Sequence, residues 1–201
     1  SLLGSINFYK SDAIINDKEF ENINSEDAIN SYSANIKINN GSFNKILSDA
    51  IDIDFGSGKL SNLTFNNIQN DAIDVSGSVI DINGVKANNC GDKIISVGEK
   101  SKIKITNLIG DNSFIGIANK DASITEAKNI TLNSVKIGFA SYIKKNEYLS
   151  PYLDVKNYKF NSKGTLYLKD KNSRLDLDNQ LKKKFNNEII KIIYVKELSY
   201  L

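Results

Sequence analysis

The sequence predicts an all-β chain, a right-handed parallel β-helix built from coils of about 22 residues. Three observations predict it: residues recur every 22 positions, apolar and polar residues alternate over short runs, and turn residues separate those runs. One such unit cannot bury its apolar face alone. Stacked units pair each strand in parallel with its equivalent about 4.8 Å away. Parallel crossover connections are almost always right-handed, which predicts the direction of winding.

The repeat is clearest in residues 25–30, 48–53 and 70–75, which share an Asp-Ala-Ile core. Equivalent apolar residues should stack as columns inside the solenoid. The predicted columns are Ile29, Ile51, Ile73 and Ile95, and Leu60, Ile82 and Ile105. Cys90 occupies the position of Ile46 and Ile68, which predicts a core residue. A column of asparagines at a turn, predicted to hydrogen-bond from coil to coil, comprises Asn22, Asn44, Asn66 and Asn88.

Two other folds compete with this prediction. A leucine-rich repeat has a similar period, but it requires a regular Leu and Asn pattern and a helical segment in each unit. Here the third side of each unit also alternates like a strand, and examples are residues 85–87 after residues 79–82. An ordinary β-sandwich does not explain a constant 22-residue spacing. The β-helix is therefore the favoured prediction.

We expect one continuous domain, with coils over residues 1–162 and a degenerating last coil plus a cap strand over residues 163–201. Residues 143–152 break the repeat and hold the single Pro, which indicates a protruding loop. Residues 189–195 are apolar and are predicted to form the last strand. The sequence lacks Met, including at position 1, so we expect a processed form or a segment of a longer protein.

The composition argues against several classes of function. The chain has no His, which removes the usual general base, the Ser-His-Asp and Cys-His arrangements and most zinc sites. The net charge is only +2 and no basic stripe alternates with aromatic residues, so nucleic-acid binding is not expected. No run of 18 apolar residues exists, so no membrane span is expected.

The aspartates are the candidate functional residues. The first group is expected to accept backbone hydrogen bonds at a turn, and it comprises Asp27, Asp49, Asp71 and Asp92. The second group alternates with inward isoleucines and should meet on the outer face, and it comprises Asp52, Asp54 and Asp74. Such stacked carboxylates repel unless a lysine, a cation or a raised pKa relieves them. They therefore predict a Ca²⁺ site or an acid/base pair for glycoside cleavage, while solvated carboxylates remain the plain alternative.

Basic residues give less support to catalysis. Arg174 is the single arginine and falls in the predicted cap, far from Asp52. Lys93, Lys100 and Lys102 come closer in coil position, but we expect them to be ordinary surface lysines.

The coil pattern resembles the pectin-lyase-like superfamily of right-handed β-helices over about 150 residues. Within it, residues 48–53 and 70–75 are similar to the aspartate-bearing coils of polygalacturonase-type hydrolases, which implies Asp49 and Asp71 as catalytic candidates. The Gly-His-Gly and Arg-Ile-Lys motifs of those enzymes have no counterpart here. The Asp-Ala-Ile-Asp repeats and the closing residues 189–194 also resemble β-helical segments of CotH-type bacterial proteins, which implies a non-catalytic accessory module.

Three hypotheses follow. The first is a non-enzymatic scaffold or binding module of a larger surface or exported bacterial protein, associated with a polysaccharide or a flanking domain. The second is a polysaccharide lyase or glycoside hydrolase centred on Asp49, Asp52, Asp71 and Asp74. The third is a helix stabilised by Ca²⁺ at Asp52, Asp54 and Asp74. No other cofactor is expected, and an extracellular or cell-surface location fits the first hypothesis best.

Overall fold

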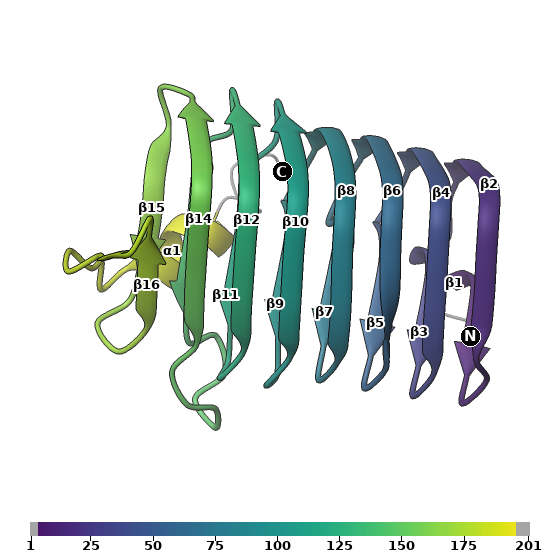
Figure 1. Cartoon of the computed structure of the whole chain (residues 1–201), viewed down its shortest axis with the longest axis horizontal. Coiled ribbons are helices and arrows are strands. Elements are labelled where there is room, and N and C mark those ends of the chain that lie inside the picture. The colour runs from purple at the N-terminus through teal and green to yellow at the C-terminus, as the bar shows by residue number, and fades with distance from the viewer. Residues whose placement is uncertain (1–3, 196–201) are drawn as a thin grey trace.

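The computed structural model describes residues 4–195, which form a parallel β-solenoid of two facing sheets (Figure 1). Each coil gives one strand to each sheet, and equivalent strands pair in parallel with the next coil. The strands of the nearer sheet run upward in Figure 1, those of the far sheet run downward, and the chain advances to the left. The solenoid is therefore right-handed, as the sequence predicts.

Sheet A holds the short strands, and its strands β3, β5 and β7 include all or part of the recurring Asp-Ala-Ile segments. Its strands, in spatial order, are β1 (Gly4–Tyr9), β3 (Asp27–Tyr32), β5 (Asp49–Asp54), β7 (Ile73–Ser76), β9 (Lys93–Gly98), β11 (Ile115–Lys120), β13 (Ile137–Tyr142) and β15 (Thr165–Lys169). Sheet B holds the longer strands. They are β2 (Ala13–Ile23), β4 (Asn35–Ile46), β6 (Ser57–Ile68), β8 (Val79–Cys90), β10 (Lys102–Asp111), β12 (Ile124–Asn133), β14 (Tyr152–Asn161), β16 (Arg174–Leu177) and β17 (Gln180–Leu181).

The second and third runs of each predicted unit belong to one bent strand of sheet B. In β8 the bend falls at Gly84, whose φ is 77°, and in β10 it falls at Asn107, with φ 58°. One left-handed residue redirects the chain while the ladder continues on both sides, and Asn and Gly adopt that conformation most readily. Each coil therefore contributes two strands and not three, and its strand in sheet B is bent.

The predicted core columns are confirmed. Ile51 pairs with Ile29 and Ile73, Ile82 pairs with Leu60 and Ile105, and all of them are buried. Phe43 stacks between Phe20 and Phe65, with ring centroids 4.7 and 5.0 Å away. Cys90 pairs with Ile68 and is 2% exposed, as expected of a core residue.

Asparagine ladders run along both bends of sheet B, but one predicted member is misplaced. Asn44, Asn66 and Asn88 do pair in register. Asn22 does not join them, because Glu21 pairs with Asn44 and the first coil is one residue longer. The side-chain amide of Asn67 donates to Asn44 at 3.3 Å, and that of Asn89 donates to Asn67 at 2.8 Å. The ladders therefore link neighbouring coils, and they account for these asparagines structurally.

The C-terminal end differs from the prediction in one element. β15 and β16 match the expected degenerating coil, and the residues between β13 and β14 form the expected loop. Residues 189–195, however, are not a strand, because Ile189–Tyr194 form the short helix α1. Ile189 and Ile193, four residues apart, share the buried side of that helix, a spacing that suits a helix and not a strand. The run of isoleucines masked this period in the sequence.

Candidate functional site

The candidate site is the outer face of sheet A over β3, β5 and β7, which we call the acidic face. Its carboxylates are Asp27, Asp49, Asp52, Asp54, Asp71 and Asp74. In β5 two successive residues, Ala50 and Ile51, are buried, which breaks the alternation and turns both Asp49 and Asp52 outward. The structure thus brings the two predicted groups of aspartates onto one surface.

Register places Lys93, and not Asp92, at the end of the first aspartate group. Asp27 pairs with Asp49, and since Ile73 pairs with Ile95, Lys93 follows Asp71 two positions before Ile95. The sequence-based placement of Asp92 in this column is therefore wrong. The prediction that Lys93 is an ordinary surface lysine is wrong as well, because it is only 3% exposed.

Two aspartates of the first group, Asp49 and Asp71, accept backbone N–H groups at the turn, as predicted, whereas Asp27 accepts only the side-chain amide of Asn30. Oδ1 of Asp49 accepts the backbone N–H of Asp71 at 2.8 Å and the side-chain amide of Asn70 at 2.7 Å. One coil on, Oδ1 of Asp71 accepts the backbone N–H of Lys93, also at 2.8 Å. Each carboxylate therefore ties its own coil to the next. This use is structural and needs no ligand.

The second group is less well satisfied. Oδ2 of Asp52 accepts a hydrogen bond of 3.3 Å from the Asn30 amide, which also donates to Asp27 at 3.1 Å. Asp74 pairs in register with Asp52, and its Oδ1 is buried without a hydrogen bond, with only the ammonium of Lys120 at 4.0 Å. Polar groups buried in this way usually have a partner. Asp52, Asp54 and Asp74 are therefore the carboxylates with unused capacity.

Burial and the repulsion between neighbouring carboxylates raise the pKa values of Asp27, Asp49, Asp52, Asp54 and Asp71. Burial, then the neighbouring Asp54 and Asp74 charges, raise the pKa of Asp52 to about 9. Burial raises the pKa of Asp27 to about 6, and it also raises the pKa values of Asp49 and Asp54. A carboxyl group with a pKa near 9 is protonated at neutral pH. The stack therefore relieves its like-charge repulsion by holding protons as well as by lysine pairing.

Two buried lysines close the acidic face on its C-terminal side. The ammonium of Lys93 contacts Asp92 and lies 3.5 Å from Oδ1 of Asp71. Burial alone would lower the pKa of Lys93, but these carboxylates outweigh it and raise that pKa. Lys120 donates to the hydroxyl of Ser96 at 2.8 Å and faces Asp74. The sequence signal for Lys93 was its 22-residue distance from Asp71; Lys120 offered no comparable signal.

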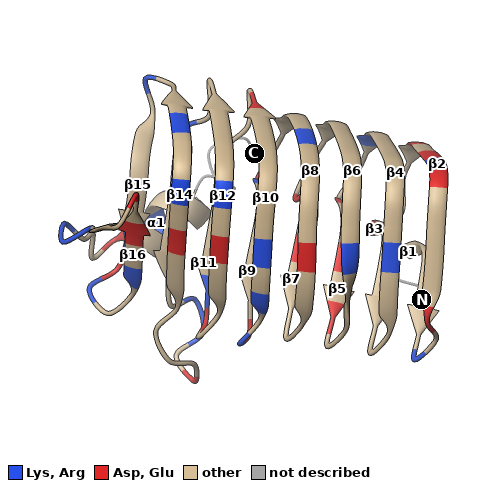
Figure 2. Cartoon of the chain, viewed as in Figure 1, with Lys and Arg blue, Asp and Glu red and all other residues tan. Residues whose placement is uncertain are grey.

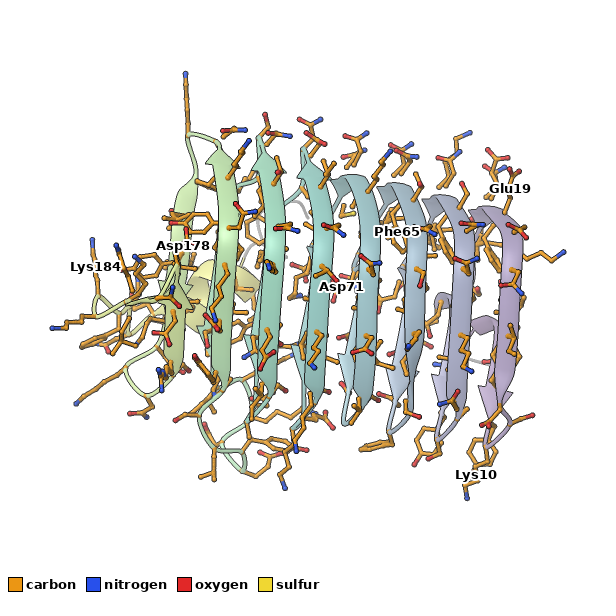
Figure 3. The ribbon with its side chains drawn as sticks, viewed as in Figure 1. Lys10, Glu19, Phe65, Asp71, Asp178 and Lys184 are labelled. Atoms are coloured by element: carbon orange, nitrogen blue, oxygen red, sulfur yellow. The ribbon has the colours of Figure 1, made fainter. Side chains whose placement is uncertain are left out.

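Helix α1 meets the acidic face at its boundary. The ring of Tyr194 lies 5.6 Å from the Lys93 ammonium and 4.8 Å from that of Lys144. Its hydroxyl is 2.7 Å from the hydroxyl of Tyr142. Asp71 itself lies on the far side of the molecule as drawn in Figure 3. The C-terminal helix therefore contributes a residue next to the site, which the predicted strand would not have done.

The other candidates are placed as follows. Within residues 4–195, no group of three or more acidic, Cys or His side chains is arranged to hold a metal ion, so the Ca²⁺ prediction gains no geometric support. Arg174 pairs with Asp176 at 2.8 Å in the last coil, away from the acidic face. Burial raises the pKa of the Cys90 thiol to about 12, which leaves it unsuited to act as a nucleophile.

A row of exposed aromatic side chains borders the acidic face, and the sequence analysis missed it. Tyr9, Tyr32 and Phe55, which we call the aromatic row, lie where three successive strands of sheet A end, Tyr9 and Tyr32 as the last strand residues and Phe55 directly after β5, and are 66%, 37% and 51% exposed. Tyr9 and Tyr32 stack with ring centroids 5.4 Å apart, and Phe55 meets Tyr32 edge-on at 5.5 Å. Tyr32 pairs in register with Asp54, so the row adjoins the carboxylates. Spacings of 23 residues, one off the period, concealed the row.

Backbone hydrogen bonds link the positions that carry the aromatic row. Lys10 N–H donates to the carbonyl of Tyr32 at 2.9 Å, and Ser33 N–H donates to that of Asp54 at 2.8 Å. A buried serine ladder begins only after Phe55, where Gly56 N–H donates to Oγ of Ser78 at 2.8 Å, and it continues along the later coils. Lys10, whose ammonium lies 5.2 Å from the Tyr9 ring, marks this lower edge in Figure 3.

Two shallow grooves lie elsewhere, and neither is lined by a carboxylate of the acidic face. One of about 690 Å³ follows the asparagine ladder at Asn67 and Asn89, and one of about 460 Å³ follows the bend at Asn62 and Asn107.

Within residues 4–195 no helix has the length and apolar character needed to cross a bilayer. Comparisons with protein-family models, with curated proteins and with solved structures found no match to this chain.

Proposed function

We propose that the chain is a non-enzymatic β-helical scaffold whose aromatic row and adjoining carboxylates bind a linear glycan. The observation that carries this proposal is the aromatic row itself, because large aromatic side chains are seldom left exposed in succession. The apolar face of a sugar ring packs against an aromatic ring by dispersion and burial of apolar area. Successive coils about 4.8 Å apart present such rings at regular intervals along one line.

The carboxylates beside the row supply the polar half of the site. Asp54 pairs in register with Tyr32, and Asp52 lies two residues before it on the same outer face. Carboxyl groups with unused capacity can hydrogen-bond sugar hydroxyls, and such polar groups fix the orientation of a stacked ligand. Those carboxylates of the acidic face that stay ionised repel a uronate. The glycan we propose is therefore neutral or amino-substituted, and not a polyuronate.

The wider setting is part of the same proposal. A rigid solenoid with a glycan-binding edge suits a module of a larger exported or cell-surface bacterial protein. The resemblance of the coil pattern to pectin-lyase-like β-helices and to CotH-associated segments supports this setting. On this proposal the shared feature is the scaffold, and the hydrolytic activity of polygalacturonase-type enzymes is not carried over.

Binding of soluble polysaccharides, measured by affinity electrophoresis and calorimetry, tests the proposal. The panel comprises a neutral β-glucan, chitosan and polygalacturonate. Tyr32→Ala and Phe55→Ala should each weaken binding of the neutral or amino glycan roughly two- to tenfold, since one aromatic stack contributes about 0.5–1.5 kcal/mol. Phe185→Ala, which removes an exposed ring in the C-terminal segment, should leave binding unchanged. Absence of binding to the whole panel, or equal loss in all three variants, would refute the proposal.

A second candidate is a glycoside hydrolase that uses Asp52 as general acid with Asp74 beside it. The observation that favours it is the pKa of Asp52, raised to about 9 by burial and neighbouring charge, which keeps that group able to donate a proton at neutral pH. It predicts release of reducing ends from a bound glycan, abolished by Asp52→Asn while binding persists. If the glycan binds but no reducing ends are released, the hydrolase candidate is rejected and the scaffold proposal stands.

A further inference from the structure

A single column of charged side chains crosses the outer face of sheet B, one from each coil between β4 and β14. We call it the charge column, and its members are Lys37, Lys59, Asp81, Lys104, Glu126 and Asp154. Figure 2 shows it as a row of blue and red segments across the nearer sheet. Five of the members are exposed and Asp154 is half-buried. They point away from the core because their neighbours in sequence are buried.

The signs along the column are self-complementary. Read from β4 to β14 they run plus, plus, minus, plus, minus, minus. The same column read backwards places Asp154 opposite Lys37, Glu126 opposite Lys59 and Lys104 opposite Asp81. All pairs are then of opposite charge. A two-fold axis parallel to the strands produces this arrangement, because it reverses the order of the coils and keeps each column facing itself.

The column is poorly neutralised within one chain. Among the ion pairs of residues 4–195, only Asp154 of the six takes part, with Lys156 at 3.2 Å. Lys37 and Lys59 are register neighbours of like charge, as are Glu126 and Asp154. Like charges directly opposite on paired strands destabilise a sheet. Opposite charges brought by another molecule would relieve both ends of the column together.

The flanking columns tolerate the same contact. On one side, reversal sets Val79 opposite Lys102 and Ile124 opposite Ser57. On the other side it sets Lys128 opposite Ser61. Over these six coils, no charged residue in either flanking column faces a residue of like charge in the other copy. The alternative axis, along the solenoid, would place every charge against its own copy and is repulsive throughout.

We propose that sheet B is a homodimer interface, in which a second copy of this chain packs face to face and antiparallel through the charge column. The contact area can be calculated from the sheet itself: six strands spaced by about 4.8 Å, each contacting the partner over about five residues of 3.3 Å, cover roughly 470 Å² of each copy. The total of roughly 900 Å² lies below the standard size of stable interfaces, which defines a weak and salt-sensitive dimer. This proposal is independent of the glycan site, which lies on the turns and on sheet A.

Sedimentation equilibrium of the 201-residue chain tests it. At about 25 mM salt the wild type should dimerise in the micromolar range, and at about 500 mM salt the dissociation constant should rise at least tenfold. In the Lys59→Glu variant, residue 59 of each copy would face Glu126 of the other copy, so two pairs of like charge form per dimer. This change should also raise the dissociation constant at least tenfold. The double variant Lys59→Glu, Glu126→Lys restores both pairs and should restore the dimer.

Lys163→Glu is the matched control, since it makes the same change in net charge at an exposed site off the column. It should leave dimerisation unchanged. Circular dichroism confirms that each variant folds, and if Lys59→Glu does not, Lys104→Glu replaces it with Asp81→Lys as the rescue. A wild type that remains monomeric at 0.5 mM and low salt overturns the proposal. So does a dimer that is insensitive to the charge reversals, or one that the double variant fails to restore.

Discussion

The outer face of sheet A has two regions with the same backbone and opposite chemistry. Over β5 and β7 the outward positions are carboxylates, and Asp52 and Asp74 share one column. In the same column, two and three coils past β7, the strands β11 and β13 carry Ala118 and Ala140 instead, and every residue of both strands is buried. The apolar region is covered by α1, whose Ile189 and Ile193 pack on it. The acidic region has no such helix within the described chain.

This difference shows that the solenoid register alone does not decide whether a face is core or surface. The side chain at each register position decides whether another element must cover it. The apolar positions are covered by α1, whereas the carboxylates are stabilised by lysines, shared hydrogen bonds and protonation. Lys93 and Tyr194 stand at the boundary between the two regions, where the ammonium meets both Asp71 and the aromatic ring. Three predictions test the roles assigned to these two regions.

Loss of the Lys93 ammonium should have the largest effect. Lys93→Met leaves Asp71 buried without its counter-ion and should lower the free energy of unfolding by about 3–5 kcal/mol. Urea unfolding measures it. The double variant Lys93→Met, Asp71→Asn removes both charges and should recover much of the loss, and Lys86→Met, at an exposed site, should change little. A loss in Lys93→Met no greater than in Lys86→Met would contradict the role given to this pair.

Uncovering the apolar region should have the next largest effect. Ile193→Asp places a charge on the buried side of α1, against Tyr142 and its neighbours, and should lower the free energy of unfolding by about 2–4 kcal/mol. Ile192→Asp, on a side chain that is 41% exposed, is the matched control and should cost far less. Chemical denaturation compares the two. Equal stability of both variants would mean that α1 does not cover this region.

Protonation of Asp52 should make the stability of the chain depend on pH. The pKa of Asp52 in the folded chain, about 9, exceeds its ordinary value of 3.8, so the folded state holds a proton that the unfolded state releases. Its contribution to stability is therefore complete below pH 4 and declines as the pH rises to 9. The urea midpoint should fall between pH 5 and pH 9, and Asp52→Asn should flatten that fall. Glu147→Gln, in the exposed loop, should leave the slope as in the wild type.

Much of the fold was predictable because β-solenoids repeat one local rule. The 22-residue spacing of Ile29, Ile51 and Ile73 defines coil length, and the alternation defines which side chains face inward. Asp49 and Asp71 were likewise predictable as turn residues, since an aspartate before a strand commonly accepts backbone hydrogen bonds. These features depend on near neighbours in sequence or on the same position one coil away.

The features that were missed depend on small departures from that rule. The first coil is one residue longer, which displaced Asn22 from its predicted column. Lys93 was assigned to the surface because lysines are seldom buried, although register places it directly beyond Asp71. The helix α1 was taken for a strand because a run of isoleucines satisfies both periods. The aromatic row escaped notice because its spacing is one residue off the repeat.

The coil length, the inward columns and the identity of the outward carboxylates can be deduced from the amino-acid order. Which of those carboxylates hold protons or pair with lysines, which outer region is covered, and which rings border the site become visible in the folded chain. Strand periodicity acts between adjacent residues and adjacent coils, whereas burial of Lys93, docking of Tyr194 and the raised pKa of Asp52 arise from groups that meet after the coils have stacked.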